Sequence, residues 1–237
     1  MAELVDALDS KSCDCEVVSV RFRLRVLRPL RFTKRPFLFP KTIALFCAMA
    51  NIKEGPYFEA IKKHYVEFWG KKYTELTLTD GPAAELGKHF KVLEFEPQQP
   101  DDIWCYATVG TSNPKDGGKL ELFMLSSKQD TSIVELLYSA AQYHRTGDGL
   151  GLDHTINFGK PWQDNSKCDY AIVSPPYTEP QEFMEIMTVA GITKFYWLLP
   201  ITSAERDYKI EHGAENLEEL FEAHNMQYWD ANRESLA

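Results

Sequence analysis

The amino-acid sequence predicts an α+β fold, in which a mixed β-sheet is flanked by helices. Hydrophobic residues recur with helical spacing at 57–69 and 132–145, and they alternate with strand spacing at 103–109. Short uninterrupted apolar runs at 171–173 and 195–199 are typical of central strands covered on both faces. Because helical and strand patterns interleave without repeats, we expect a single domain over residues 49–237.

The first helix and the first two strands are predicted from hydrophobic spacing and from the glycine and turn residues that end them. The helix at 57–69 is expected to end at Gly70, since glycine is common just past a helix C-terminus. In the strand at 103–109, alternation places Cys105 in the core and Trp104 and Tyr106 on the opposite face. A turn through 113–118 then leads to a second strand at 120–124.

The remaining helices are placed by capping signals. Ser132 and Glu135 have the spacing of a capping box, and Gly147 is positioned to end that helix. Thr202 and Glu205 have the same capping-box spacing and predict a helix to about residue 212. Asn216 is expected to cap the last helix.

Composition restricts the function classes. The chain has 237 residues, is 44% hydrophobic and carries a net charge of −9. No apolar run approaches the roughly 20 residues that a membrane-spanning helix needs, so we expect no membrane association. A net negative charge argues against nucleic acid as the partner, since phosphate binding needs a basic surface. The cysteine spacing fits neither a disulfide framework nor a zinc site, which favours a reduced cytoplasm.

The charge is unevenly distributed along the chain. Residues 17–48 contain eight basic residues and no acidic one, and the whole 1–48 block has nine Lys/Arg against five Asp/Glu. The remaining 189 residues therefore carry 17 basic and 30 acidic residues, a net charge of −13. Such a break in composition marks a boundary between residues 48 and 49.

Three interpretations of the 1–48 block compete: an export segment that ends at Ala48-Met49-Ala50, a basic arm for nucleic acid, and a non-native leader. Segments 3–7, 9–12 and 20–23 can be back-translated into the D-arm, anticodon loop and T-arm of a leucine transfer RNA gene. We therefore expect that translation starts at Met49. Mass spectrometry of the native N-terminus tests this, and a cellular peptide covering Ser19–Arg28 would contradict it.

Few residues suggest catalysis. Gly147-x-Gly149-x-Gly151 follows a predicted helix instead of opening one, so we expect a connector and no phosphate loop. Asp153 and His154 could form a carboxylate–imidazole pair, and with Arg145 they are the candidates for an intracellular enzyme of unknown reaction. No spacing of histidines or cysteines predicts a metal site.

Five segments in order resemble the Suppressor of fused family, from near Tyr57 to the C-terminus. Residues 104–112 are similar to its W-x-Y-x-T-x-G-x-S segment, and 121–124 to the E-L strand that follows. Asp153-His154-Thr155 is similar to its G/D-H-[TV] segment. Residues 199–205 resemble the bacterial P-[IL]-T-x-x-E turn, and 230–235 the D-x-x-R-x-S close.

The resemblance implies a non-enzymatic protein-binding module of the short bacterial type, without a cofactor. Animal members bind and restrain Hedgehog-pathway transcription factors, whereas bacterial members are thought to include immunity proteins that neutralise toxins. We therefore expect a cytoplasmic protein whose partner is another protein, a toxin domain with a basic surface being the leading candidate. The residues expected to contact the partner are Trp104, Tyr106, Arg145, Asp153 and His154.

Overall fold

The computed structural model describes residues 54–79, 81–99, 102–114 and 119–237. The helices are α1 (Glu54–Trp69), α2 (Ala83–Leu86), α3 (Ser132–Thr146), η1 (Gln181–Phe183), α4 (Ser203–His212) and α5 (Ala214–Ala223). The strands are β1 (Tyr73–Leu76), β2 (Lys91–Phe95), β3 (Trp104–Val109), β4 (Leu120–Ser126), β5 (Thr155–Asn157), β6 (Tyr170–Ser174), β7 (Glu185–Thr188) and β8 (Gly191–Ile201). The expected leader 1–48 and the expected start at Met49 lie outside the described residues.

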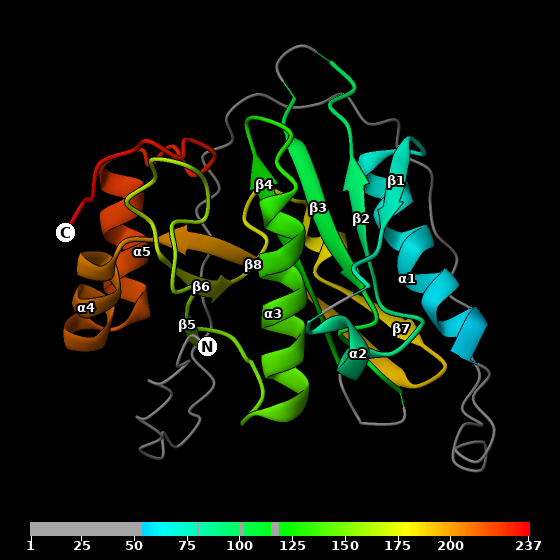
Figure 1. Ribbon diagram of the computed structural model, residues 1–237. Coiled ribbons are helices and arrows are strands. Elements are labelled where there is room, and N and C mark those ends of the chain that lie inside the picture. The colour runs from blue at the N-terminus through cyan, green and yellow to red at the C-terminus, as the bar shows by residue number, and fades with distance from the viewer. Residues whose placement is uncertain (1–53, 80, 100–101, 115–118) are drawn as a thin grey trace. The chain divides into compact units, whose positions relative to one another are not determined.

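In the described part of the chain, eight strands form one mixed sheet (Figure 1). Seven of them follow the order β1-β2-β3-β4-β8-β6-β5, and the eighth, β7, pairs with β8 beside this path. All neighbouring strands are antiparallel except β4 and β8, which run parallel with Phe123 opposite Trp197. Strand β7 pairs with the first residues of β8, whereas β6 pairs with its last residues. The predicted α+β class with a mixed sheet is therefore confirmed.

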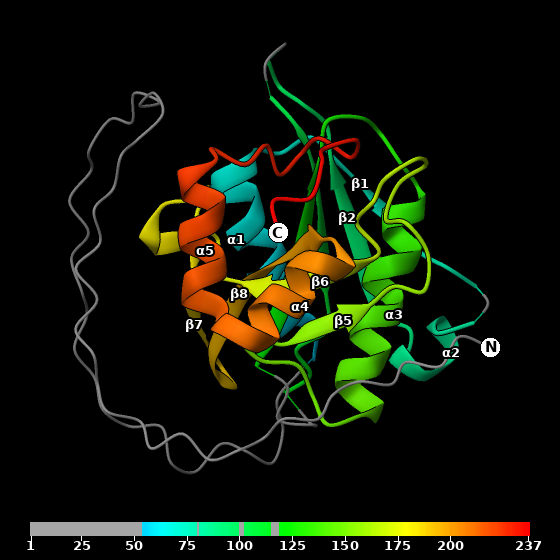
Figure 2. The same cartoon turned by 90° about the vertical axis from the view of Figure 1, so that its left-hand side faces the viewer.

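Helices cover both faces of the sheet (Figure 2). Helices α2 and α3 pack on one face around a core that includes Leu122, Leu137 and Val173. Helices α1 and α5 pack on the other face around a core that includes Ile61, Phe195 and Leu217. Because adjacent residues of a strand point to opposite faces, β3 and β4 contribute to both cores.

Local signals are partly confirmed. The helix before Gly70 ends at Trp69, Gly147 caps α3, and Thr202 with Glu205 forms a complete capping box. The capping box at Ser132 was wrong: Asp130 accepts the Ser132 N–H at 2.9 Å instead. The Asn216 cap was also wrong, since α5 begins at Ala214 and the Asn216 amide donates back to His212.

The sequence patterns missed several strands, β2 among them. Strand β2 is almost fully buried, but the buried carboxylate of Glu94 interrupts its apolar run. The sequence pattern therefore does not indicate a strand there. Strands β1 and β7 are short and largely exposed, so they lack a hydrophobic alternation to detect. Among the described helices, none combines the length and the apolar composition needed to cross a bilayer.

Candidate protein-binding surface

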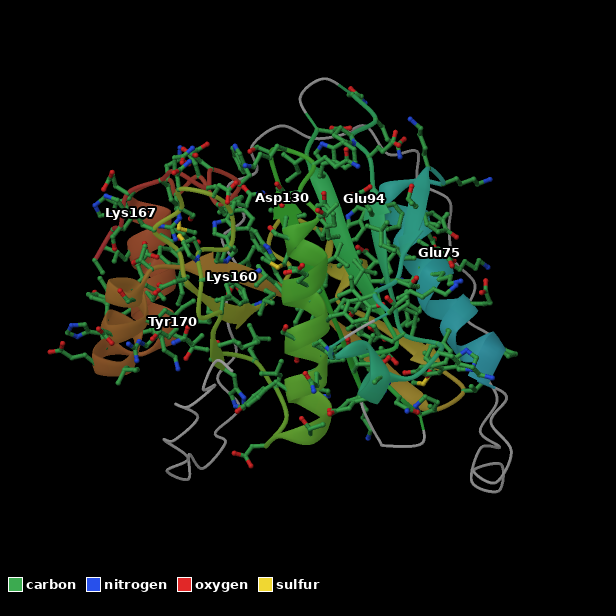
Figure 3. The ribbon with its side chains drawn as sticks, viewed as in Figure 1. Glu75, Glu94, Asp130, Lys160, Lys167 and Tyr170 are labelled. Atoms are coloured by element: carbon green, nitrogen blue, oxygen red, sulfur yellow. The ribbon has the colours of Figure 1, made fainter. Side chains whose placement is uncertain are left out.

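Tyr106, expected on an exposed strand face, is a core residue. Its side chain is fully buried against α3, and its hydroxyl accepts the Asp130 N–H at 2.8 Å. The charges of Glu94 and Asp130 act on this hydroxyl. Figure 3 labels Glu94 on β2 and Asp130 just before α3. Trp104 is half-buried and packs against the same core. The expectation of exposed aromatic anchors on β3 was therefore wrong for Tyr106, because α3 covers this face of the strand.

The Arg145 side chain is engaged within the fold. Its guanidinium donates to the Leu86 carbonyl oxygen at 2.6 Å and also to the Gly110 carbonyl oxygen. These bonds tie the end of α3 to α2 and to the turn after β3. These hydrogen bonds give the guanidinium a structural role within the fold. The expected contact of Arg145 with a partner stays a prediction.

The W-x-Y-x-T-x-G-x-S segment and the following E-L strand meet at a buried carboxylate, Glu121. Thr108 donates its hydroxyl to Glu121 at 2.6 Å, and the Gly110 N–H donates at 3.0 Å. The Thr111 and Ser112 N–H groups donate at 3.2 Å each, and the Ser112 hydroxyl donates as well. Five donors thus surround a fully buried side chain. Burial raises the pKa of Glu121 to about 7, and the hydrogen bonds oppose that rise.

Gly110 is required in this turn. Its φ of +106° lies in the left-handed region, and a Cβ atom would approach the Phe90 Cα to 3.2 Å. The motif residues Thr108, Gly110, Ser112 and Glu121 therefore build a hydrogen-bonded network in the protein interior.

The last two motifs also join each other. Arg233 binds the Glu205 carboxylate through both terminal nitrogens, at 2.6 and 2.7 Å, and donates to the Pro200 carbonyl oxygen at 3.1 Å. The hydroxyls of Thr202 and Ser235 lie 2.7 Å apart. Because Glu205 is fully buried and Arg233 only 9% exposed, this pair fastens the C-terminal segment to β8 and α4.

Asp153 belongs to a charged surface that the sequence only partly indicated. It precedes β5 with a φ of +65°, and it is close enough to Glu218 and Tyr177 for their charges to interact. The acidic surface is defined as Asp153, Tyr177, Glu215, Glu218 and Glu222. It combines the turn before β5, the turn after β6 and one side of α5. Of the residues that the sequence predicts to contact a partner, Asp153 is the one that belongs to this surface.

Burial is partial on the acidic surface and shifts its titration. The Tyr177 side chain is 50% exposed, and its hydroxyl lies within hydrogen-bonding range of the Glu218 carboxylate. Desolvation raises the pKa of Glu218; Tyr177 lowers it and the charge of Asp153 raises it further. Desolvation likewise raises the pKa of Asp153, against the charges of Lys209 and His154. The acidic surface thus joins an exposed aromatic ring to partly buried carboxylates.

His154 is exposed beside Asp153, and its imidazole lies about 4 Å from where a Cβ on Gly151 would be. The two residues adjoin, but their described neighbours include no hydroxyl or thiol nucleophile hydrogen-bonded to His154. Within the described ranges, no group of three His, Cys, Asp or Glu side chains is arranged to hold a metal ion. No specific observation favours the alternative of an enzyme that uses Asp153 and His154.

Solved structures share this architecture. A suppressor of fused homologue from Neisseria gonorrhoeae is 29% identical, with a TM-score of 0.66 over 76% of this chain and 97% of that one. A Sufu–Fu complex structure is 16% identical, with a TM-score of 0.58 over 76% of this chain and 92% of that one. Drosophila Suppressor of Fused is 15% identical, with a TM-score of 0.59 over 76% of this chain and 51% of that one.

Sequence comparison agrees with the fold. No curated protein sequence matches this chain. The sequence pattern of the Suppressor of fused protein (SUFU) family matches residues 87–234, which include both buried networks, around Glu121 and around Arg233. The resemblance seen in the sequence motifs is therefore confirmed, and the chain belongs to the Suppressor of fused family.

Proposed function

We propose that this protein is a non-enzymatic, cytoplasmic binding module that captures a protein partner with a basic surface. An immunity protein that neutralises a toxin domain is the form of this function that best suits a short family member with an acidic domain. No catalytic group and no cofactor take part. The observation that carries the proposal is the acidic surface, where the turn before β5 and helix α5 place carboxylates around an exposed tyrosine from the turn after β6.

Electrostatics support a basic partner. Residues 49–237 carry a net charge of −13, and on α5 the acids Glu215, Glu218 and Glu222 recur on one side without a basic residue in the helix. Such a field attracts a cationic domain over long range and accelerates association at low salt. Tyr177 supplies the aromatic contact that often dominates the binding energy once charges have aligned the partners.

Charge reversal on α5 is expected to weaken partner binding. The partner is first isolated from the native host by co-purification with the tagged, wild-type protein. The variant E218K/E222K is expected to lower the affinity by about tenfold or more, because it replaces attraction by repulsion at the surface. Titration calorimetry at two salt concentrations measures the effect, which should shrink as salt screens the charges.

Glu219 provides a control on the same helix, with half the charge change of E218K/E222K. Its side chain is exposed, and it is not among the charged residues that raise the pKa of Glu218, which are Asp153, Glu215 and Glu222. E219K should therefore change the affinity by less than about threefold. Equal affinity of E218K/E222K and the wild type for the isolated partner would refute the acidic surface as the contact. Co-purification of a bound small molecule without a protein partner would refute the binding function itself.

A further inference from the structure

The hairpin formed by β7 and the start of β8 exposes a group of apolar side chains. Met187 is 73% exposed, Val189 58% and Ile192 42%. In the part of the chain that the structure describes, these are three of the six exposed large hydrophobic side chains. Because soluble proteins rarely gather exposed apolar side chains in one place, such a group marks an interaction surface.

The strand register shows which side chains share this surface. Glu185 lies opposite Lys194, and Met187 lies opposite Ile192. Every second residue of a strand points to the same face, and so do cross-strand partners, so these four side chains share one face. All four are exposed. The hairpin face is defined as Glu185, Met187, Ile192 and Lys194, with Val189 in the turn at its end.

The opposite side of the hairpin is fixed to the domain. Ile186 packs against the core that α1 covers, and the Thr193 hydroxyl lies 3.1 Å from the Tyr57 hydroxyl of α1. The Thr188 hydroxyl donates to the Gly191 carbonyl oxygen at 2.7 Å and closes the turn. The hairpin face is therefore held in place before binding, which lowers the entropy cost of an association.

The charges on the hairpin face restrict what can cover it. One cross-strand row is apolar, and the other carries the acid Glu185 beside the base Lys194. Among the described residues, no ion pair within 4 Å involves either of them. A partner surface with charges of one sign would meet one attractive and one repulsive charge here. A surface with the same acid–base row, turned round, would meet attraction at both positions.

We propose that two copies of this protein associate through the hairpin face, around a twofold axis parallel to β7 and β8. Such an axis places β7 of each copy over β8 of the other, as in two stacked sheets. Glu185 of each copy then faces Lys194 of the second copy, and Met187 faces Ile192. A twofold axis across the strands would instead turn the charged row toward the end of the hairpin that carries Val189.

The contact is small, so we expect a weak dimer with a dissociation constant of about 100 µM. Residues 49–237 carry a net charge of −13, which makes two copies repel each other at low salt. At about 0.15 M salt this repulsion is screened beyond about 8 Å, whereas charges in direct contact across the hairpin face still interact. The proposal is independent of the protein partner, because no residue of the hairpin face belongs to the acidic surface.

Sedimentation equilibrium of the purified full chain tests the dimer, at concentrations from about 10 µM to about 1 mM in about 0.15 M salt. The variant M187K is expected to weaken dimerisation by at least about tenfold, since it places a charge in the apolar row. I210K is the control, because it adds the same charge at an exposed apolar side chain on α4 and should change dimerisation by less than about threefold.

Charge exchange tests the twofold arrangement. E185K and K194E should each weaken dimerisation by about tenfold, because each places like charges opposite one another at two positions. An equimolar mixture of E185K and K194E should associate about as tightly as the wild type, since one copy then carries two positive charges and the other two negative charges. Circular dichroism of each variant verifies the fold.

Three results would overturn the proposal. A wild-type protein that remains monomeric at about 1 mM would exclude the dimer. Equal losses in M187K and I210K would show that the hairpin face is not the contact. A mixture of E185K and K194E that associates no more tightly than either variant alone would exclude the pairing of Glu185 with Lys194 of the second copy.

Discussion

Replacing Glu121 by leucine is expected to destabilise the fold by about 4 kcal/mol, because three backbone N–H groups and two hydroxyls would lose their acceptor in the core. E121Q should cost about 2 kcal/mol, since one oxygen remains but the amide group faces the Thr111 N–H. Urea unfolding followed by tryptophan fluorescence measures both. E182Q, at an exposed position, is the control and should stay within about 0.5 kcal/mol of the wild type.

The effect of E121Q on stability is expected to depend on pH. With a folded-state pKa of about 7 against an ordinary value of 4.5, the folded protein holds more protons than the unfolded chain between these values. The contribution of Glu121 to stability therefore falls as pH rises from 4.5 to 7, by about 3 kcal/mol, and is constant above. E121Q should lack this pH-dependent contribution. Its loss in free energy of unfolding, relative to the wild type, should therefore be larger at pH 5 than at pH 8. The same deficit at both pH values would contradict the assignment.

Replacing Arg233 by alanine is expected to cost about 3–5 kcal/mol, because it leaves the fully buried Glu205 carboxylate without its countercharge. R233K should cost less, about 2 kcal/mol, since a lysine retains the charge but loses the bidentate geometry and the bond to Pro200. Urea unfolding gives the free energies. Limited proteolysis should show faster cleavage of the segment after Met226 in R233A.

A double variant separates the loss of a countercharge from the loss of packing. E205Q/R233M removes both charges, so it should be more stable than R233A by about 1 kcal/mol or more. R206A serves as the control, because Arg206 stacks on the half-buried ring of Tyr170 and pairs with the exposed Asp207. If R233A unfolds at the same urea concentration as R206A, the proposed role of the Arg233–Glu205 pair in stability is wrong.

Much of the fold could be predicted because local patterns report burial directly. The alternation of Cys105, Ala107 and Val109 placed β3 correctly, and the spacing of Thr202 and Glu205 placed α4, since each signal involves residues a few positions apart. β2 was missed because the buried Glu94 breaks its apolar run, and only its neighbours Tyr106 and Gln129 explain why a carboxylate is tolerated there.

The roles of the motif residues depended on long-range contacts. In the sequence, Glu121 is one acid within a strand and Arg233 is a residue near the C-terminus. Their roles follow from the turn at 110–112, which donates hydrogen bonds to Glu121, and from the pairing of Arg233 with Glu205. The acidic surface needed Tyr177 and Asp153 to meet α5. The sequence by itself determined the fold class, several elements and the family, because these depend on short-range periodicity and ordered motifs. The tertiary structure alone decided which polar side chains are buried in networks and which remain available for binding, because strand order and helix packing set that exposure.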